Sequence, residues 1–165
     1  MDILDYLEAD QDALRSLIVE FRIADEESAH EAEAFTALVS AAKVQSEAQE
    51  AVLIPLALGS ETLRTAIQPT LERIAGAREV EKMIECCTNR ATWRSSVNIY
   101  CEMLENGMEE ETKRLLPALF DHVSVAERRK LGTNYKKLRG FRAYRSNEKP
   151  TDWQSLWAFV ISQAG

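Results

Sequence analysis

Apolar side chains recur at alternating intervals of three and four residues through most of this 165-residue chain. Residues with that spacing lie on one face of an α-helix, so the pattern predicts helices with one buried stripe each. The first stripe consists of Leu4, Leu7, Gln11, Leu14, Ile18 and Phe21. Three more stripes follow, in residues 35–56, 70–84 and 93–115. Short connections between four such helices predict an all-α, up-down-up-down four-helix bundle.

Capping residues and polar breaks predict where these helices begin. Ser28 and Glu31 have the spacing of a capping box, and Ser60 is a suitable cap for the third helix. The polar residues 88–90 separate the third helix from the fourth. Pro69 lies within the third helical segment, where we expect it either to kink the helix or to restart it.

Charge divides the chain into an acidic body and a basic segment. Residues 1–125 contain 11 Lys and Arg residues and 24 Asp and Glu residues, a net charge of −13, whereas residues 126–145 carry a net charge of +7. We predict the bundle over residues 1–122 and a helical extension over residues 123–165, packed together as one domain. The extension consists of a basic helix that ends near Arg139 and a final tryptophan-containing helix.

The sequence predicts a cytoplasmic protein without a membrane-spanning segment. No apolar run is long enough to cross a bilayer, and the acidic N-terminus lacks the basic-then-apolar order of a signal peptide. The three cysteines, an odd number, favour a reducing compartment over a disulfide framework. The adjacent pair, Cys86 and Cys87, permits redox chemistry, but a structural role in the helix is the simpler interpretation.

Polar or very small residues interrupt each stripe near its middle. If the helices align, these residues fall at a similar depth and face one another. They are Gln11, Gln45, Gln49, Ala77, Gly107 and Glu111. A carboxylate at a core position costs free energy unless it is paired or hydrogen-bonded. A glycine in mid-helix costs about 1 kcal/mol relative to alanine, so we expect a packing reason for Gly107.

The order of these interruptions resembles the hemerythrin-like (HHE cation-binding) domain family over residues 2–138. That family places a histidine in each helix, and two of its helices carry His-x-x-x-Glu followed six residues later by proline. The segments QSEAQEAVLIP (residues 45–55) and GMEEETKRLLP (residues 107–117) have the same spacing. The resemblance implies that the six interrupting residues occupy the positions of metal ligands.

Only Glu111 retains a residue type that ligates metal in that family. Neutral amides are poor ligands for iron, and the two histidines, His30 and His122, lie at predicted helix ends. The sequence therefore predicts no metal centre, no cofactor and no catalytic constellation. We expect a metal-free hemerythrin-like bundle that acts as a regulatory or protein-interaction module. Two alternatives stay open: a metal-binding protein with an altered site for oxygen or iron, and a bundle that binds a small ligand in the vacated pocket.

The extension contains the residues we predict to contact a partner. They are Arg128, Arg129, Lys136, Lys137, Arg139, Trp153 and Trp157. A protein partner or a second copy of the chain suits this surface. Nucleic acid is disfavoured because the acidic body repels phosphate.

Overall fold

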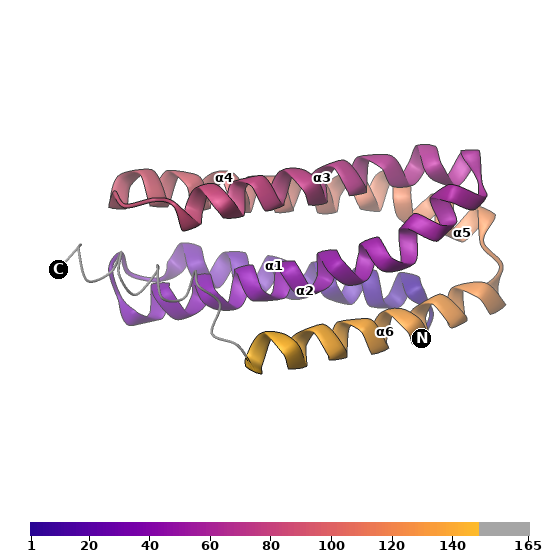
Figure 1. Cartoon of the computed structure of the whole chain (residues 1–165), viewed down its shortest axis with the longest axis horizontal. Coiled ribbons are helices and arrows are strands. Elements are labelled where there is room, and N and C mark those ends of the chain that lie inside the picture. Colours follow the sequence, from indigo (N-terminus) through magenta and orange to yellow (C-terminus); the bar gives the residue numbers. More distant parts are fainter. Residues whose placement is uncertain (149–165) are drawn as a thin grey trace.

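The computed structural model describes residues 1–148, with side chains to residue 141, and every regular element in that range is helical (Figure 1). The elements are α1 (Ile3–Ile23), α2 (Ala29–Gly59), α3 (Glu61–Glu85), α4 (Arg90–Glu110), the π-helical segment η1 (Glu111–Leu115), α5 (Leu116–His122) and α6 (Val125–Glu148). The all-α prediction is confirmed. The predicted final helix, with Trp153 and Trp157, lies outside the described residues.

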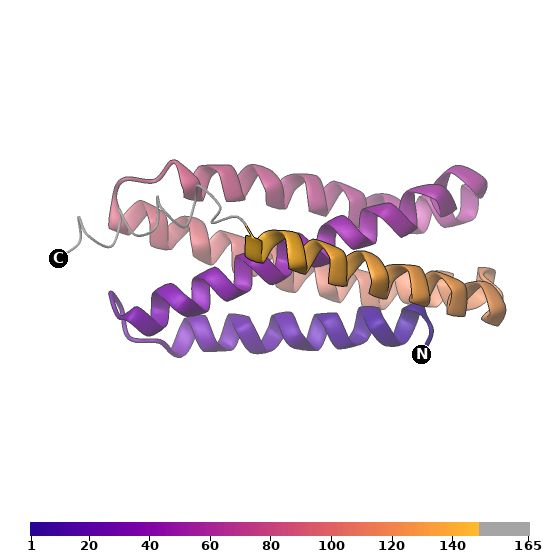
Figure 2. The same cartoon turned by 60° about the horizontal axis from the view of Figure 1, so that its bottom comes forward.

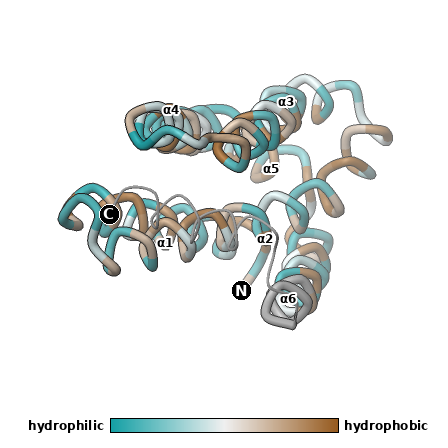
Figure 3. Tube along the Cα trace, turned by 60° about the vertical axis from the view of Figure 1, so that its left-hand side comes forward, coloured by the Kyte–Doolittle hydropathy of each residue, from teal (hydrophilic) through white to brown (hydrophobic). Residues whose placement is uncertain are grey.

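Successive long helices run in opposite directions and lie side by side (Figures 1 and 2). Neighbours in the chain pack together, as α1 with α2, α2 with α3 and α3 with α4, and α1 also contacts α4. α6 returns along α1 and α2, on the side away from α3 and α4 (Figure 3). We call α1 to α5, with η1, the helical body.

Side chains of the predicted types cap the helices. The hydroxyl of Ser28 accepts a hydrogen bond from the backbone N–H of Glu31 and so caps α2, while the Glu31 carboxylate accepts a hydrogen bond from the N–H of Glu27, one residue before the cap. Ser60 caps α3 and Asn89 caps α4 in the same way. The predicted helix starts are therefore correct at all three positions.

Two helical segments are longer than the alternatives that predicted a stop. α3 is one helix through Pro69, so of the two alternatives given for that residue the restart is wrong, and α6 continues past Arg139 and Gly140 to Glu148. Proline lacks a donor but does not always end a helix that is buried along one face, because packing of that face outweighs a single missing hydrogen bond. A glycine inside α6 is tolerated for a similar reason, at a cost of about 1 kcal/mol.

The core consists of two apolar clusters. One, the Trp93 cluster, includes Leu14, Ile18, Phe21, Phe35, Leu38, Trp93, Val97, Tyr100 and Leu104. The other, the Leu53 cluster, includes Ile3, Leu7, Val52, Leu53, Ile67, Leu115, Leu119 and Tyr135. Between Leu7 and Leu14 on α1, and between Ala42 and Val52 on α2, the buried residues are mostly polar. The interruptions predicted from the sequence thus separate two hydrophobic regions.

α6 is attached to the helical body through one face. Tyr135 is fully buried, and Arg128 is buried between Asp2 and the ring of Phe120. Gly132 permits the close approach of α6 to α1, because a Cβ there would lie 2.8 Å from the backbone carbon of Asp2. Among the described helices, none combines the length and apolar character needed to cross a bilayer.

Candidate functional site: a polar layer across the helices

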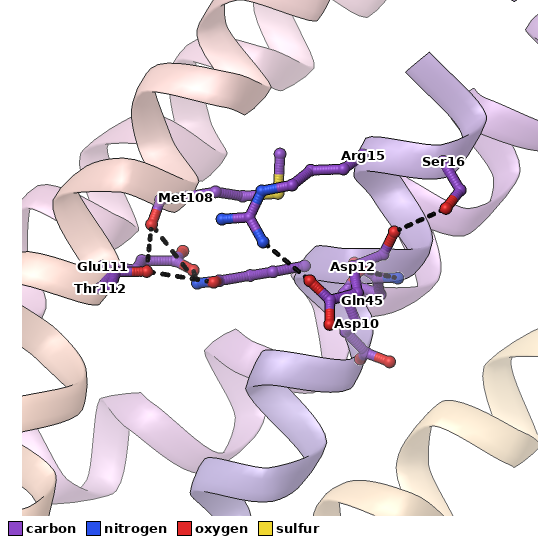
Figure 4. A network of polar contacts seen from close by, with 9 residues as sticks. Asp10, Asp12, Arg15, Ser16, Gln45, Met108, Glu111 and Thr112 are labelled. Atoms are coloured by element: carbon purple, nitrogen blue, oxygen red, sulfur yellow. Dashed lines mark hydrogen bonds and ion pairs between the residues drawn. The ribbon is translucent and has the colours of Figure 1, made fainter. Parts of the chain in front are cut away.

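Four of the six predicted layer residues meet in the interior. Gln11 of α1, Gln45 and Gln49 of α2 and Glu111 of η1 are buried and border the same small space. Figure 4 labels Met108, Glu111 and Thr112 on one side of this region and Asp10 and Gln45 on the other. We call Gln11, Gln45, Gln49 and Glu111, together with Arg73 described below, the polar layer.

Hydrogen bonds connect α1 to η1 across the layer. Nε2 of Gln11 donates to Oε2 of Glu111 over 3.0 Å, and the hydroxyl of Thr112 donates to Oε1 of Gln11 over 3.2 Å. Glu111 begins the π-helical segment, where Leu116 N–H bonds to Glu111 C=O with the i→i+5 spacing. Such a segment shifts the buried face by one residue, and here both Glu111 and Leu115 are buried.

Arg73 of α3 is the residue that the sequence analysis missed. Its Nη2 atom lies 2.6 Å from Oε1 of Glu111 and 3.1 Å from Oε1 of Gln49, so one guanidinium joins α3 to both α2 and η1. The Arg73 side chain is 14% exposed and that of Glu111 is 2% exposed, so the pair lies largely out of water. A buried carboxylate needs a counter-charge, and the unexplained charge of Glu111 was the signal available in the sequence.

Gly107 gives Arg73 its path into the layer. A Cβ at residue 107 would lie 1.7 Å from Cδ and 2.5 Å from Nε of Arg73. The packing reason expected for this mid-helix glycine is therefore the Arg73 side chain. Ala77 belongs to the Trp93 cluster and does not border the space at the layer.

The interior of the layer is filled. The cavity among its residues has a volume of about 10 Å³, close to the minimum that one water molecule occupies. A larger hollow lies on the outer side of Arg73, between α3 and α4, with a volume of about 380 Å³. Pro69, Met103, Gly107 and Arg114 are among its lining residues. The space left by small residues therefore opens at the surface, whereas the centre is closed.

A second polar group joins the layer to α6. Nε2 of Gln45 donates to the backbone carbonyl of Asp10 over 3.4 Å, and the Asp10 carboxylate accepts hydrogen bonds from the Tyr135 hydroxyl and the Arg139 guanidinium. Burial raises the pKa of Asp10, and the two donors partly oppose that shift. Burial and the nearby Asp10 carboxylate raise the pKa of Tyr135.

Two other buried carboxylates lie outside the layer. Glu81 accepts a hydrogen bond of 2.8 Å from the Tyr100 hydroxyl and lies 3.8 Å from Nζ of Lys43; burial raises its pKa. Glu31, in the first turn of α2, is fully buried and paired with Arg90 and Arg94 of α4. The contacts of Glu81 join α3 to α2 and α4, and the ion pairs of Glu31 join α2 to α4.

The donor set of the layer does not suit a metal ion. Three of its members are neutral amides, and the single carboxylate already binds the Arg73 guanidinium. Among the described residues, no three His, Cys, Asp or Glu side chains gather in a way that would hold a metal. His30 and His122 are exposed at helix ends, as predicted. A guanidinium therefore supplies positive charge where the hemerythrin-like resemblance implies cations.

The predicted partner-binding residues divide into two groups. Arg128 and Arg139 face the helical body and pair with Asp2 and Asp10, respectively. The side chains that remain exposed are those of Arg129, Lys136 and Lys137. Cys101 is buried in α4, whereas Cys86 is exposed and Cys87 half-buried just past the end of α3, so the expected structural role inside a helix is wrong for the adjacent pair.

Comparison of the chain with protein-family models, curated proteins and solved structures gives no match. The resemblance to hemerythrin-like domains stays a prediction that depends on residue spacing alone.

Proposed function

We propose that this chain is a metal-free, hemerythrin-like four-helix bundle that acts as a regulatory or protein-interaction module. The observation that carries the proposal is the ion pair between Arg73 and Glu111 in the polar layer. A guanidinium that holds the sole layer carboxylate excludes a cation by charge and by volume, because the remaining cavity of about 10 Å³ is too small for a hydrated ion.

The arrangement of the helices supports the same proposal. Antiparallel helices with a polar layer at mid-depth are what the resemblance of residues 45–55 and 107–117 to hemerythrin-like domains implies. With the interior filled, chemistry at the layer would require the buried pair to separate first. Breaking a buried ion pair by losing one partner costs about 3–5 kcal/mol. Activity of this protein is therefore assigned to its surface.

Elemental analysis of protein purified without chelator tests the proposal. We expect iron, manganese and zinc at trace levels only, and no uptake of Fe²⁺ added under anaerobic conditions. Stoichiometric metal in the purified protein would overturn it. Repeating the Fe²⁺ titration with Glu111→Gln provides the control, because metal bound at the layer would lose its only carboxylate ligand.

The hollow between α3 and α4 favours small-ligand binding as a second candidate function. Its volume of about 380 Å³ lies within the range of small-molecule sites. Its walls combine apolar Pro69 and Met103 with the polar Arg73 and Asn106. A thermal-shift screen against small metabolites tests this function. A true ligand should stabilise the wild type and lose its effect in Met103→Trp, which fills the hollow; a screen without such a ligand removes this candidate.

A further inference from the structure

α6 has two faces with different roles. Its inward face, with Arg128, Gly132 and Tyr135, is held against the helical body by the contacts described above. In the part of α6 whose side chains the structure describes, four cationic side chains are exposed instead. We call these four, Arg129, Lys130, Lys136 and Lys137, the outer basic face. Because the inward face is fixed, the outer basic face cannot turn toward the acidic residues of α1 and α2.

Most cations of the helical body form ion pairs, whereas those of the outer basic face form none with the residues that the structure describes. Of the 11 Lys and Arg residues in residues 1–125, ten form ion pairs with carboxylates of the body. The other, Arg64, donates to the backbone carbonyl of Ala57. The four cations of the outer basic face have no ion-pair partner among the described residues. Positive charge without a local partner is thus concentrated on one side of one helix.

We propose that the outer basic face is a docking surface for an acidic segment of a partner protein. This inference rests on the proposed function, which assigns activity to the surface, and it specifies the chemistry of the partner. Residues 129–137 extend about 12 Å along the helix axis at 1.5 Å per residue. A short run of Asp and Glu residues covers that length and supplies carboxylates for all four cations.

Size and charge favour an acidic polypeptide over nucleic acid. Specific protein–DNA interfaces bury on the order of 1,000–2,500 Å² of protein surface, and affinity for DNA depends strongly on how many phosphates the Lys and Arg side chains contact. Four cations on two helical turns cover less surface than that and contact few phosphates. The body behind them, residues 1–125, has a net charge of −13 and repels a long polyanion that extends beyond the face. A short acidic segment avoids this repulsion.

Fluorescence anisotropy with a labelled oligo-glutamate peptide of about twelve residues, longer than the face at 1.5 Å per helical residue, tests the inference. Titrations use the full chain at about 0.05 M and 0.2 M salt. Salt weakens binding through exposed charge pairs more than binding through other contacts, so the change in affinity shows which kind holds the peptide. The test variant reverses all four charges of the outer basic face to Glu. The matched control reverses four exposed, paired cations of the body, Arg15, Lys82, Lys113 and Arg114, to Glu.

Wild type and control should bind the peptide, more weakly at the higher salt, and the test variant should lose about tenfold or more in affinity. All three proteins should have the same helical circular dichroism, since the substituted side chains are exposed. Equal peptide binding by test variant and control, or no binding by the wild type, would overturn the inference. So would tighter binding of a duplex DNA than of the peptide, or a wild-type dimer that the test variant abolishes. Metal content of the same samples reports on the proposed function separately.

Discussion

Arg73 and Gly107 share one volume: the Cδ atom of Arg73 lies 1.7 Å from where a Cβ of residue 107 would stand. The glycine on α4 and the arginine on α3 therefore depend on each other, because the glycine leaves free the volume that the arginine side chain fills. A side chain at residue 107 would displace Arg73 from its path to Glu111, and without Arg73 the carboxylate of Glu111 is buried without a cation.

Gly107→Ala should destabilise the protein, although alanine is the better helix former by about 1 kcal/mol. The added methyl displaces Arg73 and weakens a buried ion pair, so we expect a net loss of about 1–3 kcal/mol in the free energy of unfolding. Urea denaturation measures it. Gly140→Ala is the control, because a Cβ there meets nothing within 4 Å, and that variant should gain stability. A gain at both positions contradicts the role given to Arg73.

Arg73→Met and Glu111→Gln form a double-mutant cycle across the layer. Each single change leaves one buried charge or donor without its partner, and each should cost about 3–5 kcal/mol. The double variant should recover much of that loss, since both charges are gone. Strict additivity of the two effects in urea denaturation would show that the pair does not interact.

Glu81→Gln should change how stability depends on pH. Burial raises the pKa of Glu81 above the ordinary value of 4.5, so the folded state binds its proton more tightly than the unfolded state does. Stability contributed by this protonated group is present below pH 4.5 and is lost as pH rises through the raised pKa. The melting temperature of Glu81→Gln should therefore increase relative to wild type between pH 4.5 and pH 7. Glutamine still accepts the Tyr100 hydrogen bond, so a constant difference would contradict the raised pKa.

Tyr135→Phe tests how α6 is held. The change removes the hydroxyl that donates to Asp10 and keeps the ring in the Leu53 cluster. Leaving a buried carboxylate short of one donor should cost about 1–3 kcal/mol. Lys136→Ala, next to it on the exposed face, should change stability by less than about 0.5 kcal/mol. Thermal unfolding followed by circular dichroism compares the two, and similar losses would mean that the Asp10 contact is not specific.

Introducing histidine at Gln11, Gln45, Ala77 and Gly107, with Glu at Gln49, should not by itself create a metal site, because the new side chain at residue 107 and the Arg73 guanidinium compete for the same volume beside Glu111. Adding Arg73→Ala to these five substitutions should create a metal site. Titration with Co²⁺, followed by its visible absorption, distinguishes the two proteins. A folded variant with all six changes that binds no Co²⁺ would show that the alignment with hemerythrin-like domains is wrong.

The helices could be predicted from the sequence because their signals are local. The spacing of Leu7, Leu14 and Ile18 depends only on helix periodicity, and Ser28 and Ser60 cap the residues that follow them directly. The end of the basic helix near Arg139 was predicted less well, and so was the restart that was one alternative at Pro69. At Gly140 and Pro69 the local signal favours a break, while burial along the rest of the helix favours continuation.

The polar layer was predicted only in part, because its partners come from different helices. Gln11, Gln45, Gln49 and Glu111 were identified as interruptions of apolar stripes. Arg73 does not interrupt the apolar stripe of α3. It lies beside that stripe, and its long side chain carries the guanidinium inward to Glu111. Arg139 likewise belongs to a basic run, and only the packing of α6 against α1 shows that it contacts Asp10.

The hydrogen bond from Tyr135 to Asp10 joins residues 125 positions apart in the chain. During synthesis, α1 leaves the ribosome first, yet the helix that covers Asp10 is made after all the others described here. A buried carboxylate on α1 thus stays exposed to water until residue 139 has emerged. We expect early intermediates to keep α1 loosely attached, and completion of α6 to be the event that fixes the first helix in place.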